Sequence, residues 1–292
     1  MTGSSPGLAI SFWDRILGEV DALITTTPPD AIPALLEAIP LDVFALLQLE
    51  RPSRFGNLSN FLPTMPSGEV QESWNGAQGR ELLRMSVDFV RRVVAKYKSE
   101  ITKPLIESSV LDFGCGWGRL LRLMYRYVPH DQLYGVDPWK ESLELCRASN
   151  LKGHLALSDY VPTSLPFDRR FDMIYAFSVF THLSQKTARR VLSTLRHYLA
   201  DSGLLFITIR PKEYWRFHDG GKEAEERIAA HDREGFSFVP HGREPIDGDI
   251  TYGDTSFTLD WLADATKDEW VIDSTDYSMG DLLQVIVTLK PS

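Results

Sequence analysis

The residues that decide the fold read VLDFGCGWGR, from Val110 to Arg119. The first four predict a buried strand, and the glycines that follow at alternate positions open a helix. Glycines in such a turn let the backbone approach a ligand closely, and the first turn of the helix offers N–H groups without partners. We therefore expect a nucleotide-like ligand at the carboxyl ends of the strands, near the switch point of the sheet.

The spacing of these glycines argues against a dinucleotide. The dinucleotide fingerprint is G-x-G-x-x-G, whereas this chain has G-x-G-x-G, with Arg119 where the third glycine should stand. Asp112 lies two residues before the first glycine. A carboxylate there repels a pyrophosphate, but it can accept hydrogen bonds from a ligand ammonium group or organise the loop.

Strand-like and helix-like segments alternate on both sides of this turn. The expected strands are 109–113, 133–137, 154–157, 171–177 and 203–209. Helices are expected from Arg119, over 141–148 and over about 184–199, so the order predicts βαβ units and a parallel sheet. After a helix over 256–266, strand-like runs at 270–278 and 282–289 lie too close together for a crossover helix. They should form an antiparallel pair at the edge of the sheet.

The segments outside this pattern predict an appendage and a cap. Ser11 and Asp14 suggest a capping box for a helix over about 11–25, and further short helices should break near Pro40. A linker without periodicity should cover about 51–79, so 1–79 form a helical appendage and linker, and 80–292 form the main domain. Within that domain, about 211–255 are expected to form a cap over the ligand. The N-terminal helices suit a homodimer surface, a substrate lid or a packing supplement.

Composition limits the classes of function. The chain has 292 residues and a net charge of -9, so it lacks the basic surface typical of nucleic-acid or anionic-membrane binding. Its two cysteines are too few for a disulfide framework and suggest a reducing compartment. Because no apolar run reaches membrane-spanning length and the first residues lack the pattern of a signal peptide, we expect a cytoplasmic protein without a membrane span.

The glycine-rich stretch resembles the first motif of the class I S-adenosylmethionine-dependent methyltransferases. Further landmarks of that family follow in order: Asp137 in YGVDPWK, Asp159 in LALSDYVPTSLPF, the run from Phe177 to Leu183, and the strand that ends at Ile209. The resemblance spans roughly 80–290. It implies a Rossmann-like α/β fold with a seven-stranded, mostly parallel sheet and an antiparallel C-terminal hairpin.

The resemblance also implies a cofactor, S-adenosyl-L-methionine, and the residues that bind it. Asp137 should hold the ribose hydroxyls, Asp159 the adenine amino group, and Arg119 the carboxylate end. The full set of expected cofactor-binding residues is Trp74, Asp112, Gly114, Cys115, Gly116, Arg119, Asp137, Pro138, Trp139, Asp159, Tyr160 and Phe177. Plainer interpretations remain open: Asp137 can cap a strand, Asp159 can begin a turn, and Trp139 can be a surface or core residue.

Three residues are candidates for the chemistry. His182 lies between the fourth strand and a helix with Ser184 as its expected N-cap, and its ordinary pKa near about 6.5 suits a general base. Tyr214 and His218 in the cap are further candidates, and each of the three can instead be structural.

No metal is expected, since the histidines of the cap match no metal-ligand spacing. Cys115 has no nearby histidine and is expected to be structural rather than nucleophilic.

These features predict a methyltransferase that acts on a small molecule or a carbohydrate, at an oxygen. Aromatic residues in the cap suit a sugar ring or a planar metabolite, and the acidic charge argues against nucleic acid. Arg210, Lys212 and Arg216 form either a solvated charged face or a site for an anionic group of the acceptor. N-methylation, a protein acceptor, transfer of another group from the same cofactor and a non-catalytic interaction module remain alternatives.

Overall fold

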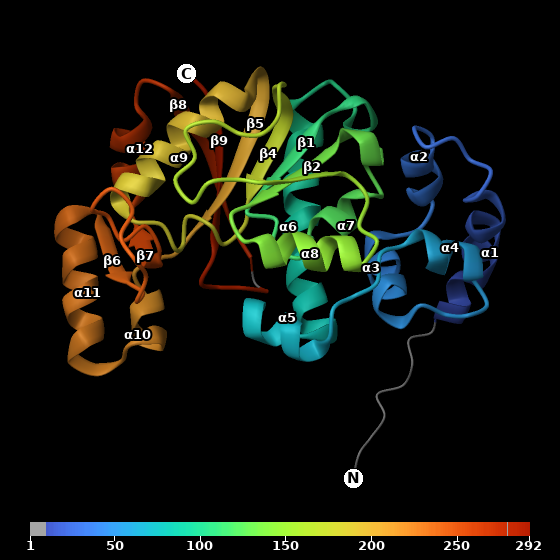
Figure 1. Cartoon of the computed structure of the whole chain (residues 1–292), viewed down its shortest axis with the longest axis horizontal. Helices are drawn as coiled ribbons and strands as arrows, with labels where there is room; N and C mark the ends of the chain where they lie inside the picture. The colour runs from blue at the N-terminus through green and yellow to red at the C-terminus, as the bar shows by residue number, and fades with distance from the viewer. Residues whose placement is uncertain (1–9, 279) are drawn as a thin grey trace, which may run out of the picture.

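A seven-stranded sheet forms the centre of the computed structural model, which describes residues 10–278 and 280–292 (Figure 1). The strand order is β3-β2-β1-β4-β5-β9-β8, with β1 to β5 parallel and β9 antiparallel to both β5 and β8. The strands are β1 Val110–Phe113, β2 Leu133–Asp137, β3 His154–Leu157, β4 Phe171–Ala176, β5 Leu199–Ile209, β8 Trp270–Tyr277 and β9 Val285–Pro291. The predicted sheet and its antiparallel hairpin are confirmed.

Helices cover both faces of the sheet. Successive residues of a strand point to opposite faces, so each buried strand presents apolar side chains to the helices on both sides. Val110 packs with α6 (Gly79–Glu100), α7 (Leu121–Met124) and α8 (Lys140–Ala148). Leu111 packs instead with α9 (Gln185–Tyr198) and α12 (Leu259–Thr266). Ser184 caps α9 as expected, since its side chain accepts a hydrogen bond from the Thr187 N–H. Two short 3-10 helices, Leu105–Glu107 and His130–Gln132, precede β1 and β2.

The N-terminal segment is more helical than the sequence predicts. A 3-10 helix, Ile10–Trp13, is followed by α1 Asp14–Leu23, α2 Ile32–Leu36, α3 Leu41–Glu50, α4 Gly56–Phe61 and α5 Gly68–Asn75. The predicted capping box is wrong, because Ser11 lies inside the 3-10 turn and Trp13 takes the N-cap position without a side-chain hydrogen bond. The expected irregular linker instead contains α4 and α5, whose glycines mark helix ends. The residues relevant to a signal peptide, 1–9, lie outside the described part.

The N-terminal helices share a hydrophobic core with the helices that cover the sheet. Leu17, Phe44 and Leu58 belong to the same cluster of buried residues as Val90 of α6. Polar contacts join the same parts: the Gln48 side chain donates a 3.1 Å hydrogen bond to the Arg122 carbonyl. The N-terminal segment is thus packed firmly on the sheet domain.

The cap lies at the opposite end of the molecule from the N-terminal helices (Figure 1). It consists of α10 Tyr214–His218, α11 Gly221–Glu234 and an antiparallel hairpin of β6 Phe236–Pro240 with β7 Gly253–Phe257. The backbone of β7 is hydrogen-bonded to the segment after β4: Gly253 N–H donates to the His182 carbonyl at 2.8 Å, and Thr255 N–H to the Thr181 carbonyl at 2.9 Å. These bonds fix the cap beside the carboxyl end of β4.

None of the helices within 10–278 and 280–292 combines the length and apolarity needed to cross a bilayer.

Candidate functional site

One cavity of about 760 Å³ opens at the carboxyl ends of β1, β2 and β4. Its lining also includes α5, parts of α6 and α9, the glycine-rich loop, the segments that follow β2, β3, β4 and β5, residues 243 and 251–252 of the cap, and the β8–β9 connection. Cavities of roughly 300–1,000 Å³ are typical of small-molecule and cofactor sites. The cavity therefore has room for a ligand of nucleotide size.

The glycine-rich loop forms the floor of the cavity. Gly114 has a φ of +78°, and a Cβ there would lie 2.5 Å from Cγ2 of Val179, so a side chain is excluded. At Gly116, whose φ is +52°, a Cβ would meet only open space. The backbone of Gly116 is thus bare toward the cavity, as close approach of a ligand requires.

Asp137 joins the second strand to this loop. Its Oδ2 accepts a 2.8 Å hydrogen bond from Gly116 N–H, and its Oδ1 accepts from Trp139 N–H at 2.9 Å and Ser142 Oγ at 3.0 Å. Burial raises the pKa of Asp137, against the effect of these donors. Asp137 therefore shapes the loop and also lines the cavity, where Oδ2 can accept a further hydrogen bond.

A buried acid, Asp112, and a partly buried cation, Arg119, flank the loop. Oδ2 of Asp112 has no hydrogen-bond partner among the described residues, and burial raises the pKa of this carboxyl well above its usual range. Arg119 donates a 2.9 Å hydrogen bond to Ser86 Oγ and lies over the Phe177 ring, 4.7 Å from its centroid. Burial lowers the pKa of Arg119 to about 10. This pair is complementary to the ammonium and carboxylate groups of an amino acid.

Aromatic residues surround the far side of Asp137. Trp74 of α5 meets Trp139 edge to face, with ring centroids 5.5 Å apart. Pro138, Asp159 and Tyr160 also line this side of the cavity, and Asp159 and Tyr160 are exposed at its rim. The arrangement suits a planar base held between aromatic rings beside carboxylate acceptors.

The predicted cofactor-binding residues thus come together in one cavity whose chemistry fits S-adenosyl-L-methionine. The unpartnered Asp112 oxygen fits its ammonium group, Arg119 its carboxylate, and Asp137 its ribose hydroxyls. Cys115 lines the same cavity, but the neighbouring Cys146 thiol and burial raise its pKa well above the usual value. A thiol with a raised pKa is a poor nucleophile, which agrees with a packing role.

His182 is the predicted catalytic residue that lines the cavity. Its Nδ1 is 2.8 Å from the Gly253 carbonyl, which can only accept, so Nδ1 carries the proton and Nε2 the lone pair. Nη2 of Arg210 lies 3.4 Å from that Nε2. Burial, followed by the charge of Arg210, lowers the pKa of His182 to about 4, so the ring is neutral at neutral pH. The imidazole ring of His182 stacks on the nearly parallel ring of Tyr252.

Tyr214 and His218 do not line the cavity. Tyr214 lies one layer away from it, with its ring centroid 3.8 Å from Cζ of the lining residue Arg210. Tyr214 Oη donates a 2.8 Å hydrogen bond to Oδ1 of Asp254, and His218 Nε2 lies 3.1 Å from Oδ2. His241 and Arg210 contact the same carboxylate at 2.7 Å and 2.5 Å. In the described chain, these groups do not form a metal-binding cluster of three or more acidic, histidine or cysteine ligands. Their catalytic roles stay predictions.

The structure adds residues to the site that the sequence did not single out. Arg243, Tyr252 and Asp281 line the cavity from two irregular connections. No spacing rule marks residues in such connections, because tertiary contacts alone bring them to the site. Of the three cationic candidates after β5, Arg210 lines the cavity, whereas Lys212 and Arg216 form exposed ion pairs with Asp232 and Glu225.

Similarities to known proteins agree with this geometry. A family model described as a methyltransferase domain matches residues 110–203. Malonyl-[acyl-carrier protein] O-methyltransferase of Halalkalibacterium halodurans is 28% identical over 139 residues, which cover 45% of this chain and 50% of that protein. Demethylmenaquinone methyltransferase of Thermotoga maritima is 29% identical over 140 residues, which cover 44% of this chain and 59% of that protein. The chain spans about half the length of the curated relatives it matches.

Among solved structures, the fold is similar to that of an S-adenosylmethionine-dependent methyltransferase from Clostridium acetobutylicum. The two share 12% sequence identity, with a TM-score of 0.51 over 77% of this chain and 97% of that one. At this identity, the likeness shows the fold.

Proposed function

We propose an activity for this chain from one premise: it contains a class I S-adenosylmethionine-dependent methyltransferase domain. The proposed activity is transfer of the cofactor's methyl group to an oxygen of a small molecule or a carbohydrate. One observation carries it: a single cavity joins the bare glycine loop, the Asp112–Arg119 pair and the Asp137 carboxylate. A domain that served only as a scaffold has no physical need to bury these charges around an open space.

The residues of the chain act chiefly by binding and alignment. The bound cofactor supplies a methyl group on a positively charged sulfur, which is already electrophilic. Asp112 and Arg119 hold the amino-acid end, Asp137 fixes the ribose, and Tyr252 and Arg243 close the side of the cavity that faces the cap. Such positioning accounts for much of the acceleration that a transfer between two bound groups requires.

The name of one relative and one feature of the site support oxygen as the acceptor atom. The Halalkalibacterium halodurans relative is named an O-methyltransferase. The acceptor side of the cavity also offers arginine side chains, which suit an oxygen-rich acceptor. Transfer of another group from the same cofactor is the rival within this class, and the mass of the product distinguishes the two.

Calorimetric titration of S-adenosylmethionine and S-adenosylhomocysteine tests the proposed function. We expect binding to the wild-type protein and at least about a tenfold weaker affinity for Asp137→Asn, since the variant removes a charged acceptor from a buried site. Asp201→Asn is the matched control, because the Asp201 side chain is 83% exposed and far along the chain from the site. A folded wild-type protein that binds neither compound would refute the proposal and favour an interaction module.

A further inference from the structure

Seven charged side chains line the cavity, and they divide into two groups. Asp112, Arg119, Asp137 and Asp159 belong to the part that fits the cofactor. Arg210, Arg243 and Asp281 remain without a role in the fit to the cofactor. Arg243 contacts both Trp139 on the cofactor side and Tyr252, whose ring stacks on His182. The charge of the acceptor can be inferred from which of these three is already neutralised by the protein.

Arg210 is neutralised from behind. Its Nη1 lies 2.5 Å from Oδ1 of the buried Asp254 and also donates to the Thr181 carbonyl at 3.1 Å. Burial acts to raise the pKa of Asp254, but hydrogen bonds from His241, Tyr214 and Arg210 together hold it well below its usual range. The Arg210–Asp254 pair therefore adds little net charge to the cavity.

Asp281 lies on the side of Arg119 and Arg210. Its Oδ1 accepts a weak 3.3 Å hydrogen bond from Leu283 N–H. Burial raises the pKa of Asp281, and the nearby Arg119 and Arg210 lower it in part. Its charge faces those two cations.

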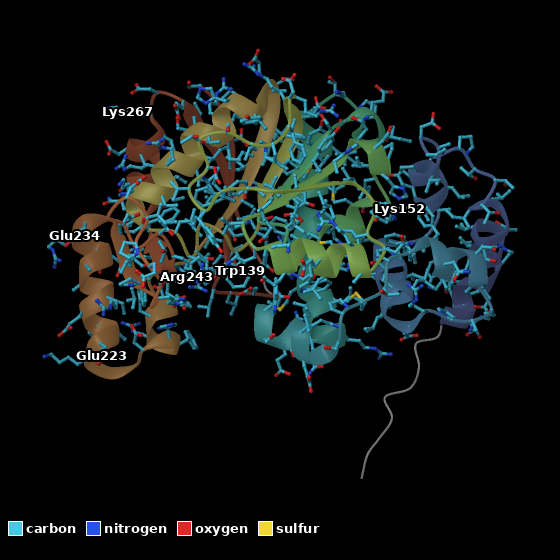
Figure 2. The ribbon with its side chains drawn as sticks, viewed as in Figure 1. Trp139, Lys152, Glu223, Glu234, Arg243 and Lys267 are labelled. Carbon is cyan, nitrogen blue, oxygen red and sulfur yellow. The ribbon has the colours of Figure 1, made fainter. Side chains whose placement is uncertain are left out.

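Arg243 has no such partner among residues 10–278 and 280–292. Its Cζ lies 4.1 Å from the ring centroid of Tyr252, 5.0 Å from that of Trp139 and 5.9 Å from that of Tyr160. Figure 2 shows Arg243 beside Trp139, on the side of the molecule where the cap lies. Over the described residues, its guanidinium makes neither an ion pair nor a side-chain hydrogen bond. Stacking uses the faces of the guanidinium and leaves its in-plane N–H groups for an oxyanion.

His182 is poorly placed to deprotonate a neutral acceptor. A guanidinium N–H group of Arg210 faces its lone pair at 3.4 Å, so a proton taken up at Nε2 would meet another N–H donor. With a pKa of about 4, the imidazole is a much weaker base than a phenolate, whose conjugate acid has a pKa of about 10. A carboxylic acid, with a pKa of about 4, is already ionised at neutral pH and needs no base.

We propose that the acceptor group is a carboxylate, bound by Arg243 in the cavity beside His182 and converted to a methyl ester. This inference rests on the proposed function and names its substrate class. One carboxylate oxygen forms a bond to the methyl carbon while the carbon–sulfur bond breaks, and the electron pair of that bond stays on sulfur. The negative charge of the acceptor cancels the positive charge of the sulfonium, so no proton is taken up or released.

The lability of the product tests the proposal. The full-length protein is incubated with methyl-labelled S-adenosylmethionine and a low-molecular-mass metabolite extract, and the labelled products are then exposed to mild alkali. Methyl esters release labelled methanol under these conditions, whereas methyl ethers and N-methyl groups do not. Release of the label as methanol supports a carboxylate acceptor. Label that stays on the product in alkali overturns the carboxylate proposal. If Asp281→Asn then loses the transfer to this alkali-stable product, Asp281 would be the base that deprotonates a hydroxyl acceptor.

Arg243→Gln tests the role of the guanidinium. With a carboxylate acceptor that becomes labelled, we expect the KM of Arg243→Gln for this acceptor to rise about 10- to 100-fold, because a charge-assisted hydrogen bond is lost. Arg243→Lys keeps a positive charge and should restore part of the affinity. Arg233→Gln is the control, because Arg233 lies on α11 with an exposed side chain paired to Glu234. An unchanged KM in Arg243→Gln overturns the assignment of Arg243.

A binding experiment covers the case in which no label is transferred. Benzoate and benzyl alcohol are titrated separately into the complex with S-adenosylhomocysteine. Preference for benzoate that disappears in Arg243→Gln supports the proposal, and equal binding of the two probes contradicts it. Because the experiment starts from the cofactor-product complex, failure of S-adenosylhomocysteine to bind would instead refute the proposed function.

Discussion

The indole N–H of Trp117 donates a 2.9 Å hydrogen bond to Oδ1 of Asn75, and it thereby joins the glycine-rich loop to the end of α5. The neighbouring Trp74 packs edge to face on Trp139. Helix α5 therefore contacts the ligand cavity at two points, one on the loop and one beside Asp137. We interpret α5 as a cover over the cofactor, in agreement with its position below the sheet in Figure 1.

Removing the Trp74 ring should weaken cofactor binding without unfolding the protein. We expect Trp74→Ala to raise the Kd for S-adenosylhomocysteine about tenfold, since the variant removes an aromatic wall of the cavity. Phe217→Ala is the control, because Phe217 is 77% exposed on α10. Calorimetry gives the Kd and circular dichroism checks the fold. Wild-type affinity in a folded Trp74→Ala protein would rule out α5 as a cover.

Asp112 should stabilise the complex with the cofactor but lower the stability of the free folded protein. Burial raises its pKa, so the free folded protein binds a proton that the unfolded chain releases near pH 4. The stability of the free wild-type protein relative to Asp112→Asn should therefore fall as pH rises above about 4, since the folded state holds more protons. Thermal melts of both proteins across this range give the difference, and parallel curves would contradict the expected titration.

The same carboxyl should make cofactor binding depend on pH. An ammonium group next to Asp112 favours the ionised acid, so the affinity of the wild-type protein should increase as pH rises through the elevated pKa of Asp112. In Asp112→Asn, we expect roughly 10- to 100-fold weaker binding and the loss of this dependence. Calorimetric titrations at several pH values measure both, and an equally steep dependence in the variant would assign the proton to another group.

The fold was largely predictable, because its signals are local. The turn from β1 into the glycine loop needs positive φ at Gly114 and Gly116, and alternating apolar runs mark the strands. Helices α4 and α5 were missed because they are short and lie among glycines and prolines, and their stability comes from packing rather than from periodicity. The capping box failed for a similar reason: a 3-10 turn occupies Ser11.

The acceptor side of the site was less predictable than the cofactor side. Asp112 and Asp137 follow from strand ends and a glycine motif, whereas Arg243 and Asp281 reach the cavity from irregular connections. The lowered pKa of His182 was also not predictable from the sequence, because it depends on burial and on Arg210, which lies 28 positions away in the chain. Contacts between residues that are far apart in the chain determine the charges in this cavity, and local sequence patterns do not reveal such contacts.

Asp254 should be a major source of stability in the cap. It is 5% exposed and accepts hydrogen bonds from Arg210, Tyr214 and His241, so Asp254→Asn leaves buried donors unmatched. We expect a loss of about 3 kcal/mol in the free energy of unfolding at pH 7. The native pKa of Asp254 is depressed, so this contribution is present above the unfolded value of about 4 and decreases as pH falls below it.

Urea unfolding at pH 7 and at lower pH measures this effect. Asp264→Asn is the matched control, because its carboxylate is 72% exposed and pairs with Arg189 at only 3.5 Å. That variant should change stability by less than about 1 kcal/mol. A similarly small change in Asp254→Asn would show that the network contributes little to folding.

The pH dependence of turnover should separate a carboxylate acceptor from a hydroxyl acceptor. Because the pKa of His182 is lowered to about 4, kcat/KM for a carboxylate, measured at saturating cofactor, should be level from about pH 6 to about pH 9, where neither the imidazole nor the acceptor titrates. His182→Gln should then lower kcat by less than about tenfold, whereas loss of a general base costs about 100- to 10,000-fold. His197→Gln, at the exposed end of α9, is the control. Two results together would contradict this expectation: a large loss of kcat in His182→Gln but not in the control, and a wild-type rate that rises through a single ionisation near neutral pH. They would mean that cofactor binding raises the pKa of His182 despite Arg210. The acceptor group would then be a hydroxyl.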